Sequence, residues 1–228
     1  IRVLCDGEAG LGHAISVTMR TPGNDTELAL GFLHGEGVLR DWRSVRRVRP
    51  AGPTGNVLRV ELQPGVDLDL ARLQRNFYTA VTSSVRLRRM EPDWTIDCRL
   101  LLGLPATLRE AQAAFSATGG LHAVGLFTRE GDLVAAFEDV GRHNAMDKLV
   151  GSRLAADALP LANSIVLLSG RASFELVQKA GAAGVPLLAA IGAPSSLAIE
   201  LAEQAGITLV AFLRDGAFNI YTHGARLR

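Results

Sequence analysis

The chain has 228 residues, enough to bury a sizeable core in one large domain or two small ones. Its formal net charge of +1 gives little reason to expect a nucleic-acid partner, and no apolar run reaches the ~18 residues that a membrane span needs. We therefore predict a cytoplasmic protein with no leader peptide and no membrane contact. Cys5 and Cys98 lie far apart and belong to no ligand-spaced pair, so neither a disulfide framework nor a zinc site is expected.

The first hundred residues carry short, weak patterns. Residues 14–19 and 56–62 alternate as half-buried strands do. Asn24, with Glu27 three positions on, predicts a helix start that both side chains cap. Glu36 lies between two glycines that end this helix, and an exposed cap residue is favoured there over a ligand contact. The arginine-rich stretch that follows is interpreted as a solvated face.

The pattern changes near Arg99, where we place a boundary between domains of residues 1–99 and 100–228. A helix is expected from Leu104 to Thr118, with Pro105 at its first position. Apolar strands and alanine-rich helices then alternate, which favours a parallel, right-handed βαβ sheet with an antiparallel final strand. The strands are expected at residues 119–127, 133–137, 164–168, 185–191, 207–212 and 218–221, with the first two joined as a hairpin by the turn at Gly131 and Asp132. The predicted fold class is α/β, with a smaller α+β domain at the N-terminus.

Residues 138–148 hold six ionisable side chains in eleven positions, between an expected strand and an expected helix. Asn144 is predicted to cap that helix, with Asp147 bonding back to it. Arg142 and His143 would then lie at the helix start, where free N–H groups favour an anion.

A second interpretation of this stretch stays open. Glu138 and Asp139 could neutralise Arg142 and Lys148, which would form an ion network with no ligand. The sequence alone does not decide between an anion site and this network.

Loops that leave the carboxyl ends of parallel strands share one edge of the sheet, and ligands bind there. This rule brings together residues 142–143, 169–173, 193–196 and 212–217. Arg142, Arg171 and Arg214 come from three of these loops, and arginine forks pair well with phosphate oxygens. The combination favours a phosphate-bearing ligand over a purely structural role.

Three other chemistries have little support. The His-x-Glu and Pro-Cys-x-x-Cys stretches of zinc deaminases are absent, and His122 and His143 have no cysteine partners, so no metal ligand is assigned. Residues 169–173 lack the spacing and the lysine of a Walker loop. A serine hydrolase that uses Ser169, Ser173 or Ser195 stays a distant alternative, because the sequence reveals no base for any of them.

Several motifs together resemble one known family. Residues 19–23, 31–37, 118–122, 138–148, 169–171 and 219–222 resemble, in the same order, the FdhD family of formate dehydrogenase accessory sulfurtransferases. The run Glu-Asp-Val-Gly-Arg-His-Asn-Ala-x-Asp-Lys is the most specific of them. The resemblance spans nearly the whole chain.

This resemblance implies a sulfur carrier that takes sulfur from a cysteine desulfurase and passes it to a molybdenum bis-guanine-dinucleotide cofactor for formate dehydrogenase. It also implies a C-terminal domain like the cytidine-deaminase fold without its zinc, and a homodimer. The cofactor is cargo, and no metal would be bound by the protein itself. The implied cofactor-binding segment is Phe212, Leu213, Arg214, Asp215, Gly216 and Ala217, and the crevice adds Arg142, His143, Ser169, Gly170 and Arg171.

One departure from the family concerns sulfur chemistry. Family members carry a Cys-x-x-Cys loop after Thr-Ser-Ser, whereas Ser84 here is followed directly by Val85. A thiolate must hold the persulfide, and Cys5 and Cys98 are not at the matching position. Either the sequence omits a loop between Ser84 and Val85, which the lack of any turn residue at that junction favours, or the chain binds the cofactor without transferring sulfur.

A guanine base offers adjacent N–H donors that one carboxylate can accept together. Asp215, Glu138 and Asp139 are the candidates to read that edge. We prefer Asp215, because Glu138 and Asp139 could be committed to ion pairs.

Overall fold

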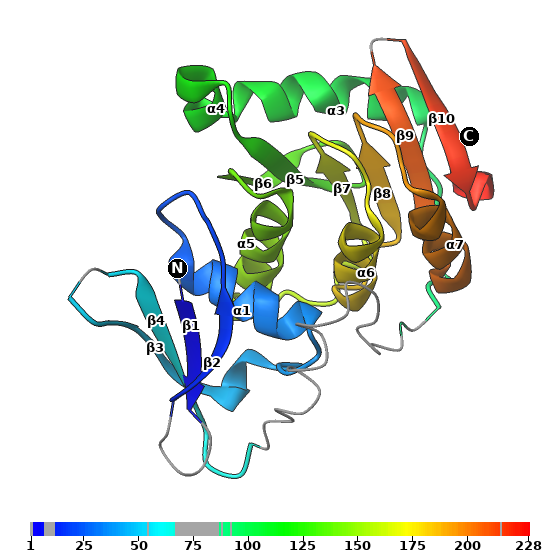
Figure 1. Ribbon diagram of the computed structural model, residues 1–228. Coiled ribbons are helices and arrows are strands. Elements are labelled where there is room, and N and C mark those ends of the chain that lie inside the picture. The colour runs from blue at the N-terminus through cyan, green and yellow to red at the C-terminus, as the bar shows by residue number, and fades with distance from the viewer. Residues whose placement is uncertain are drawn as a thin grey trace.

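A computed structural model describes residues 2–6, 12–53, 55–66, 87, 89–91, 93–214 and 216–228 of the chain. These residues form two sheets, one of four strands and one of six (Figure 1). The mixed α/β architecture agrees with the predicted class. Within the described part, no helix has the length and apolarity that crossing a membrane requires.

The four-stranded sheet has the order β2-β1-β4-β3. Its strands are β1 (Arg2–Asp6), β2 (Gly12–Val17), β3 (Val45–Ala51) and β4 (Val57–Leu62). Strands β2 and β4 were expected close to these positions, but β1 and β3 were not. The arginine-rich stretch continues into β3, an edge strand that has no fully buried residue, so its sequence carries little apolar alternation.

Helix α1 (Asp25–Gly35) packs on this sheet, with Ala29, Leu30 and Leu33 in the shared core. Asn24 precedes it in a left-handed conformation (φ 55°), and its side chain makes no capping hydrogen bond, so the predicted capping pair was wrong. Glu36 follows as the C-cap, and its backbone N–H donates to Phe32 O.

The six-stranded sheet has the order β10-β9-β8-β7-β5-β6. Its strands are β5 (His122–Thr128), β6 (Leu133–Asp139), β7 (Ser164–Leu168), β8 (Leu187–Ala190), β9 (Thr208–Arg214) and β10 (Ala217–Thr222). The parallel pairing of β7, β8 and β9 and the antiparallel β10 were predicted. The β5–β6 hairpin was also predicted, but the antiparallel pairing of β5 with β7 was not.

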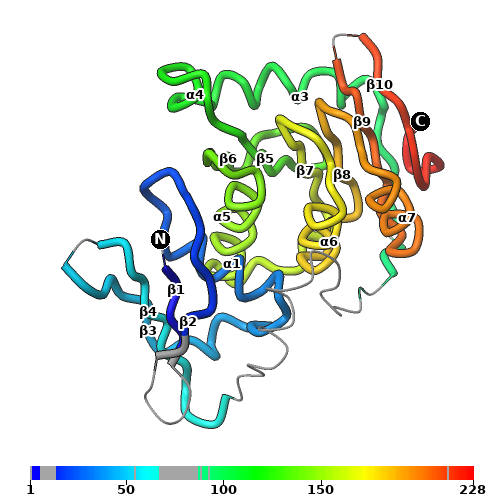
Figure 2. The backbone as a smooth tube through the Cα atoms, viewed as in Figure 1, coloured from blue at the N-terminus to red at the C-terminus, as the bar shows by residue number. Residues whose placement is uncertain are grey.

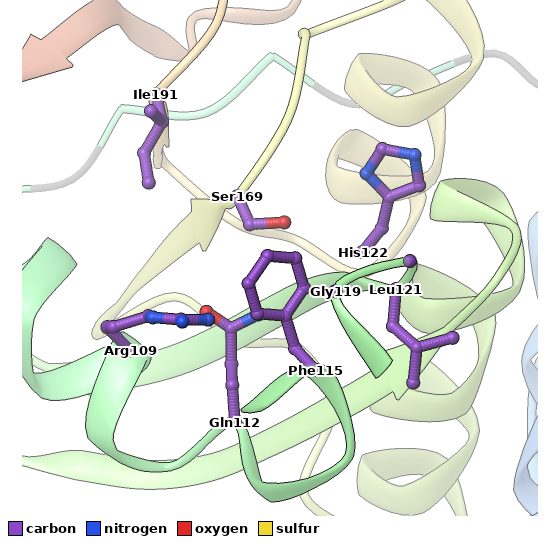
Figure 3. Close-up of a pocket in the computed structure, with 9 residues that line it drawn as sticks. Arg109, Gln112, Phe115, Gly119, Leu121, His122, Ser169 and Ile191 are labelled. Atoms are coloured by element: carbon purple, nitrogen blue, oxygen red, sulfur yellow. The ribbon is translucent and has the colours of Figure 1, made fainter. Parts of the chain in front are cut away.

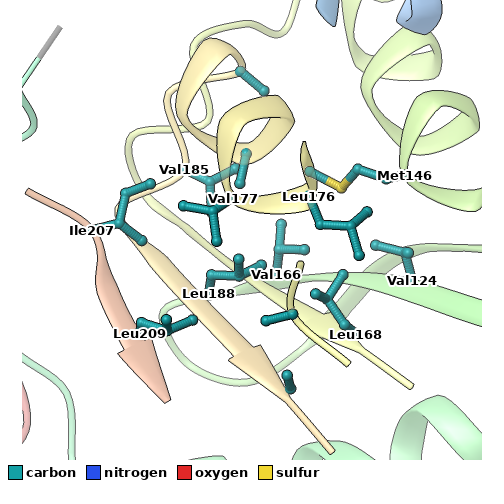
Figure 4. Packing of buried hydrophobic residues seen from close by; sticks show 14 of the residues in the cluster. Val124, Met146, Val166, Leu168, Leu176, Val177, Val185, Leu188, Ile207 and Leu209 are labelled. Atoms are coloured by element: carbon teal, nitrogen blue, oxygen red, sulfur yellow. The ribbon is translucent and has the colours of Figure 1, made fainter. Parts of the chain in front are cut away.

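Helices cover both faces of this sheet. One face carries α5 (Arg142–Ala155), α6 (Phe174–Ala182) and α7 (Ser196–Ala205), and their core includes the alternate strand residues Val166, Leu168 and Leu188 (Figure 4). The other face packs on α3 (Cys98–Glu110) through the intervening residues, among them Ile165 and Leu167. A strand buried on both faces explains the uninterrupted apolar run of β7.

Helix α3 differs from its prediction. It begins six residues before the expected start, because Asp97 caps it by accepting from Arg99 N at 2.9 Å. Pro105 lies inside α3 rather than at its first position. The chain breaks at Gln112, and α4 (Ala113–Thr118) follows as a separate short helix.

Helix α1 lies between the four-stranded sheet and α5 (Figure 2). The backbones of α1 and α5 touch where Gly31 and Gly151 meet, and Leu154 of α5 enters the core of the four-stranded sheet. Near the C-terminus, Leu227 forms an isolated parallel β-bridge with Ile96. The division into residues 1–99 and 100–228 stays a prediction, as does the likeness of the second part to the cytidine-deaminase fold.

Candidate functional site

The carboxyl ends of β6, β7, β8 and β9 share one edge of the larger sheet, as the sequence predicted. Strand β6 runs in the same direction as β7, because both are antiparallel to β5. The amino end of β5 therefore lies at the same edge. A cavity of about 480 Å³ opens there (Figure 3). Its lining residues come from the α3–α4 region and three strand ends: Arg109, Gln112, Phe115, Gly119, Gly120, Leu121, His122, Ser169 and Ile191.

Ser169 and Gly170 are predicted site residues that lie at this cavity. Ser169 extends the pairing of β7 with β5: its N–H donates to Ala123 O at 2.9 Å, and its Oγ accepts from Ala123 N at 2.8 Å. Gly170 packs against His122, since a Cβ on Gly170 would lie 3.2 Å from His122 Nδ1. A larger residue at position 170 would displace the His122 ring from the cavity.

Two of the predicted arginines surround His122. Burial, followed by the positive charges of Arg142 and Arg171, lowers the pKa of His122 below its usual value. The Nε of Arg142 is buried, and none of the described residues gives it a hydrogen-bond partner. This side of the cavity therefore carries concentrated positive charge that an anionic ligand would neutralise.

His143 lies next to Ser173 and Glu175, at 3.2 Å from Ser173 Oγ and 3.7 Å from Glu175 Oε2. Both partners approach the same ring nitrogen, Nε2, whereas a catalytic triad uses the two nitrogens separately. Burial, then the charges of Arg142 and Lys179, lowers the pKa of His143 to about 4. So weak a base does not activate a serine at neutral pH, and the hydrolase alternative gains no support.

We expect the imidazole of His143 to stay neutral down to about pH 5 and to titrate near pH 4, because its charged form is poorly solvated and repelled by Arg142. Replacing Arg142 by Ala should raise this pKa, and replacing Glu175 by Gln should lower it. NMR titration of the ring protons measures both shifts, with Arg43→Ala as a distant control. A midpoint near 6.5 in the wild type would contradict the assignment.

Helix α5 begins at Arg142, so Asn144 lies in its first turn and is not its cap. The predicted capping by Asn144 and Asp147 is wrong because tertiary contacts take both side chains. Asn144 Nδ2 donates to Met19 O at 2.6 Å and to Asp139 Oδ1 at 3.0 Å. Asp147 pairs with Lys179 at 2.6 Å.

Helices α5 and α6 begin in the loops that follow β6 and β7, at the same edge of the sheet. Neither the Gly141 that precedes α5 nor the Ser173 that precedes α6 supplies a side-chain cap. The N–H groups of their first turns form the positive ends of two helix dipoles, where anionic groups are favoured. Carboxylates of this chain lie there: Asp139 accepts from Gly141 N, and Glu175 accepts from its own N–H and from the Ser173 side chain.

The acidic part of residues 138–148 is structural. Lys148 pairs with Asp139 at 2.7 Å, and both side chains are almost completely buried. Glu138 instead accepts from Ala114 N and Phe115 N, at 2.9 and 2.7 Å, and so holds the start of α4. The ion-network interpretation is therefore confirmed for Asp139 and Lys148, but Glu138 caps a helix and does not pair with Arg142.

The predicted segment 212–217 lies further along the same edge. Phe212 has a left-handed backbone (φ 53°), and its N–H donates to Gly192 O at 3.3 Å. Arg214 is exposed and lies 5.9 Å from the centre of the Phe212 ring. Leu213 is buried in the core under α3.

The remaining residues of that segment, 215–217, follow Arg214. Gly216 and Ala217 are exposed in the β9–β10 hairpin, and Asp215 lies outside the described residues. Arg142 and Arg171 therefore share one neighbourhood, while Arg214 follows β9, two strands from β7. Strand β6 is also two positions from β7, with β5 and His122 between them, so the nearness of Arg142 and Arg171 follows from their shared effect on His122.

Sequence reasoning did not select Arg109, Gln112 or Ile191 as site residues. Phe115 was assigned only to the apolar face of a helix. Nothing in the local pattern marks these residues, because the spacing of side chains along a helix or strand is the same whether they face a cavity or a packed core. Among the residues that the structure describes, no three histidine, cysteine or acidic side chains gather as a metal site would need.

A family model described as FdhD/NarQ matches residues 11–228 of the chain. The chain belongs to the FdhD/NarQ family. Among curated FdhD relatives named sulfur carrier protein FdhD, the one from Streptomyces avermitilis is 48% identical over 95% of this chain and 84% of its own length. The relative from Saccharolobus solfataricus is 41% identical over 93% of this chain and 83% of its own.

A solved structure extends the FdhD comparison to the fold. A formate dehydrogenase accessory protein from Desulfotalea psychrophila matches with a TM-score of 0.81 and 24% identity, over 100% of this chain and 88% of that one. The alignment with the Streptomyces FdhD protein covers 237 positions, more than the 228 residues present here. That relative therefore has residues that have no counterpart in this sequence.

Proposed function

We propose that the protein is a sulfur carrier that receives sulfur from a cysteine desulfurase and delivers it to a molybdenum bis-guanine-dinucleotide cofactor, in the maturation of formate dehydrogenase. Family membership and the names of the relatives support sulfur carriage. The observation that supports the choice of acceptor is the strand edge, where Arg142 and Arg171 lie near His122 at a cavity.

The spacing of the arginines favours an elongated ligand. Arg142 and Arg171, which both act on His122, can neutralise one phosphate group together, while Arg214 follows β9, beyond β8, and would meet a second part of the same molecule. A dinucleotide cofactor has this extended form, with its charge near the middle and flat rings at its ends. The proposed binding segment therefore includes both the His122 neighbourhood and the hairpin after Phe212.

Sulfur carriage requires a thiol that the present sequence does not supply in the expected place. Cys5 is buried in the core of the four-stranded sheet, and Cys98 opens α3. Ser84 and Val85 lie outside the described residues. The proposal therefore includes a Cys-x-x-Cys loop at that junction in the intact protein, which also agrees with the longer alignment.

A second candidate function is binding of the cofactor without sulfur transfer. It is favoured by one observation, the absence of a Cys-x-x-Cys motif directly after Ser84 in the sequence as it stands. Both candidates use the same crevice, and we propose that the protein acts as a homodimer in either case.

The two candidates separate in a persulfide assay. A Cys-x-x-Cys segment inserted between Ser84 and Val85 should allow a cysteine desulfurase and cysteine to add one sulfur atom, which mass spectrometry detects as about 32 Da on the new loop. A Ser-x-x-Ser insertion is the matched control. Sequencing the gene across the two codons decides whether the loop is native, and a loop that never accepts sulfur would refute the carrier function.

Guanine-nucleotide affinity tests the crevice itself. Replacing Arg142, Arg171 or Arg214 by Ala should weaken GDP binding by about 1.5–3 kcal/mol each, the usual contribution of a charge-assisted hydrogen bond. Arg43→Ala, on the four-stranded sheet side, is the control. If titration calorimetry gives unchanged affinity for all three folded variants, phosphate recognition in this crevice is disproved.

The base preference provides a separate measurement. Glu138 and Asp139 are committed to Phe115 N and Lys148, so Asp215 remains the carboxylate that we propose to read guanine. In Asp215→Asn the preference for GDP over ADP should fall, whereas Asp139→Asn should keep it in the folded fraction. Equal preference in all forms would mean that other groups read the base.

A further inference from the structure

Three large apolar side chains project into solvent beside the start of α5. Met19 is 84% exposed, Val17 66% and Val140 50%. Single exposed apolar residues are common on protein surfaces, whereas neighbouring ones mark contact surfaces. Val17 is the last residue of β2, Met19 follows it, and Val140 follows β6, so two distant segments of the chain build this group. We call these three residues the apolar platform.

Hydrogen bonds hold the two segments of the platform side by side (Figure 1). Asn144 Nδ2 donates to Met19 O at 2.6 Å, and Val140 N donates to Thr21 Oγ1 at 3.0 Å. The hydroxyl of Thr18 donates to Asn144 Oδ1 at 3.3 Å, so this side chain points inward between two exposed neighbours. The alternation directs the apolar side chains away from the protein.

The platform rests on the buried ion pair of Asp139 and Lys148. Thr21 N donates to Asp139 Oδ2 at 3.0 Å, and Lys148 Nζ donates to Thr21 O at 2.9 Å. The backbone under the exposed side chains is therefore fixed at several points. A surface that is already ordered loses little conformational freedom when a partner covers it, and this favours binding.

Two positive charges border the platform. Arg2 is exposed and lies opposite Val17 in the ladder between β1 and β2. Arg142 is the first residue of α5, and its Nε has no hydrogen-bond partner among the described residues. Arg20 and Asp25 neutralise each other at 2.8 Å. A partner surface in which carboxylates border apolar side chains would complement this arrangement.

From these contacts we propose that the apolar platform is the docking surface for the enzyme that receives the cofactor, a formate dehydrogenase that still lacks it, through an apolar patch bordered by carboxylates. The position selects this occupant. The platform adjoins Arg142 of the crevice, and a cargo held in the crevice passes directly to a second protein only if that protein docks at the crevice edge. This inference rests on the proposed function, because a crevice that delivers no cargo needs no receiving enzyme.

The test measures, by biolayer interferometry, how cofactor-free formate dehydrogenase binds the wild type, Met19→Asp, Val140→Asp and the control Ile220→Asp. Ile220 is 48% exposed on β10, at the opposite edge of the larger sheet. Met19→Asp and Val140→Asp should each weaken binding about tenfold or more, because the interface would bury a charge against apolar groups, whereas Ile220→Asp should bind as the wild type does. All variants should keep the wild-type affinity for GDP.

Two results overturn the docking surface. One is equal binding of the enzyme by all four proteins, and the other is a wild type that does not bind the enzyme. Both leave sulfur acceptance and GDP binding, and therefore the proposed function, intact. Loss of GDP binding and of sulfur acceptance in the wild type would instead refute the proposed function itself.

Two further measurements test the identity of the occupant. Arg2→Glu should weaken binding of the enzyme and reduce its salt dependence, because it reverses a charge that faces carboxylates; unchanged affinity and salt dependence would overturn the acidic border. Sedimentation of the isolated protein should give the same mass for Met19→Asp as for the wild type. A smaller assembly in Met19→Asp would show that a second copy of this chain covers the platform, and it would overturn the proposal.

Discussion

Replacing Gly151 by Ala should destabilise the protein by about 3 kcal/mol or more, because it forces α1 and α5 apart. A Cβ at position 151 would lie 1.9 Å from Glu27 O, and one at Gly31 would lie 1.8 Å from Asp147 O. These neighbours are backbone atoms of the opposite helix, so no side-chain rotation relieves the overlap. Urea unfolding of Gly151→Ala and Gly31→Ala measures the loss.

Gly103→Ala is the matched control. Gly103 also lies inside a helix, α3, but a Cβ there would have no neighbour within 4 Å. This variant should be more stable than the wild type by about 0.5–1 kcal/mol, because alanine favours the helix. If Gly151→Ala unfolds at the wild-type urea concentration, the close contact of the two helices is disproved.

Strong local signals explain the parts of the fold that could be predicted. Strand β7 was placed at its observed bounds because it is apolar throughout and flanked by polar residues. For α7, Ser195 accepts from Ala198 N, and Gly206 ends the helix in the left-handed conformation, as the sequence indicated. Such caps involve neighbours in the chain, so the sequence carries them completely.

The errors arose where distant residues compete for a side chain. Asn144 has the residue type of a helix cap, but it bonds to Met19 and Asp139 instead. Strand β1 depends on pairing with β4, more than fifty residues away, and its own sequence is only weakly patterned. The antiparallel pairing of β5 with β7 was missed for the same reason, since the position of β5 beside β7 is decided by tertiary packing.

The candidate site was predictable only in outline. The topology rule for strand ends selected the loops of Arg142 and Ser169, and Ser169 lines the cavity. It could not find the cavity, whose walls combine the break between α3 and α4 with the ends of β7 and β8. Gln112 becomes conspicuous only through its burial at the cavity, and this property is not encoded locally.

Lys148→Met should produce a second large loss, about 3–5 kcal/mol, because it leaves a buried carboxylate without its cation. Lys148 Nζ lies 2.7 Å from Asp139 Oδ2, and the two side chains are 2% and 0% exposed. The ammonium also donates to Thr21 O at 2.9 Å and to Glu138 O at 3.3 Å. Methionine keeps most of the side-chain volume, so the effect isolates the charge and its hydrogen bonds.

The double variant Asp139→Asn with Lys148→Met should recover part of this loss, because it removes the uncompensated charge while the amide oxygen can still accept from Gly141 N. Asp157→Asn is the control, since its pairing with Arg43 is exposed and should contribute little.

The same contacts predict where Lys148→Met loosens the structure. Asp139 accepts from Thr21 N and Gly141 N, and Lys148 donates to Thr21 O, so the pair joins the segment before α1 to the start of α5. Hydrogen exchange should therefore accelerate first at residues 18–21 and 140–145, next to Arg142, and GDP affinity should fall with it. Uniform acceleration across the chain, with the first turn of α5 still protected at wild-type level, would show that the pair stabilises the fold without ordering the site.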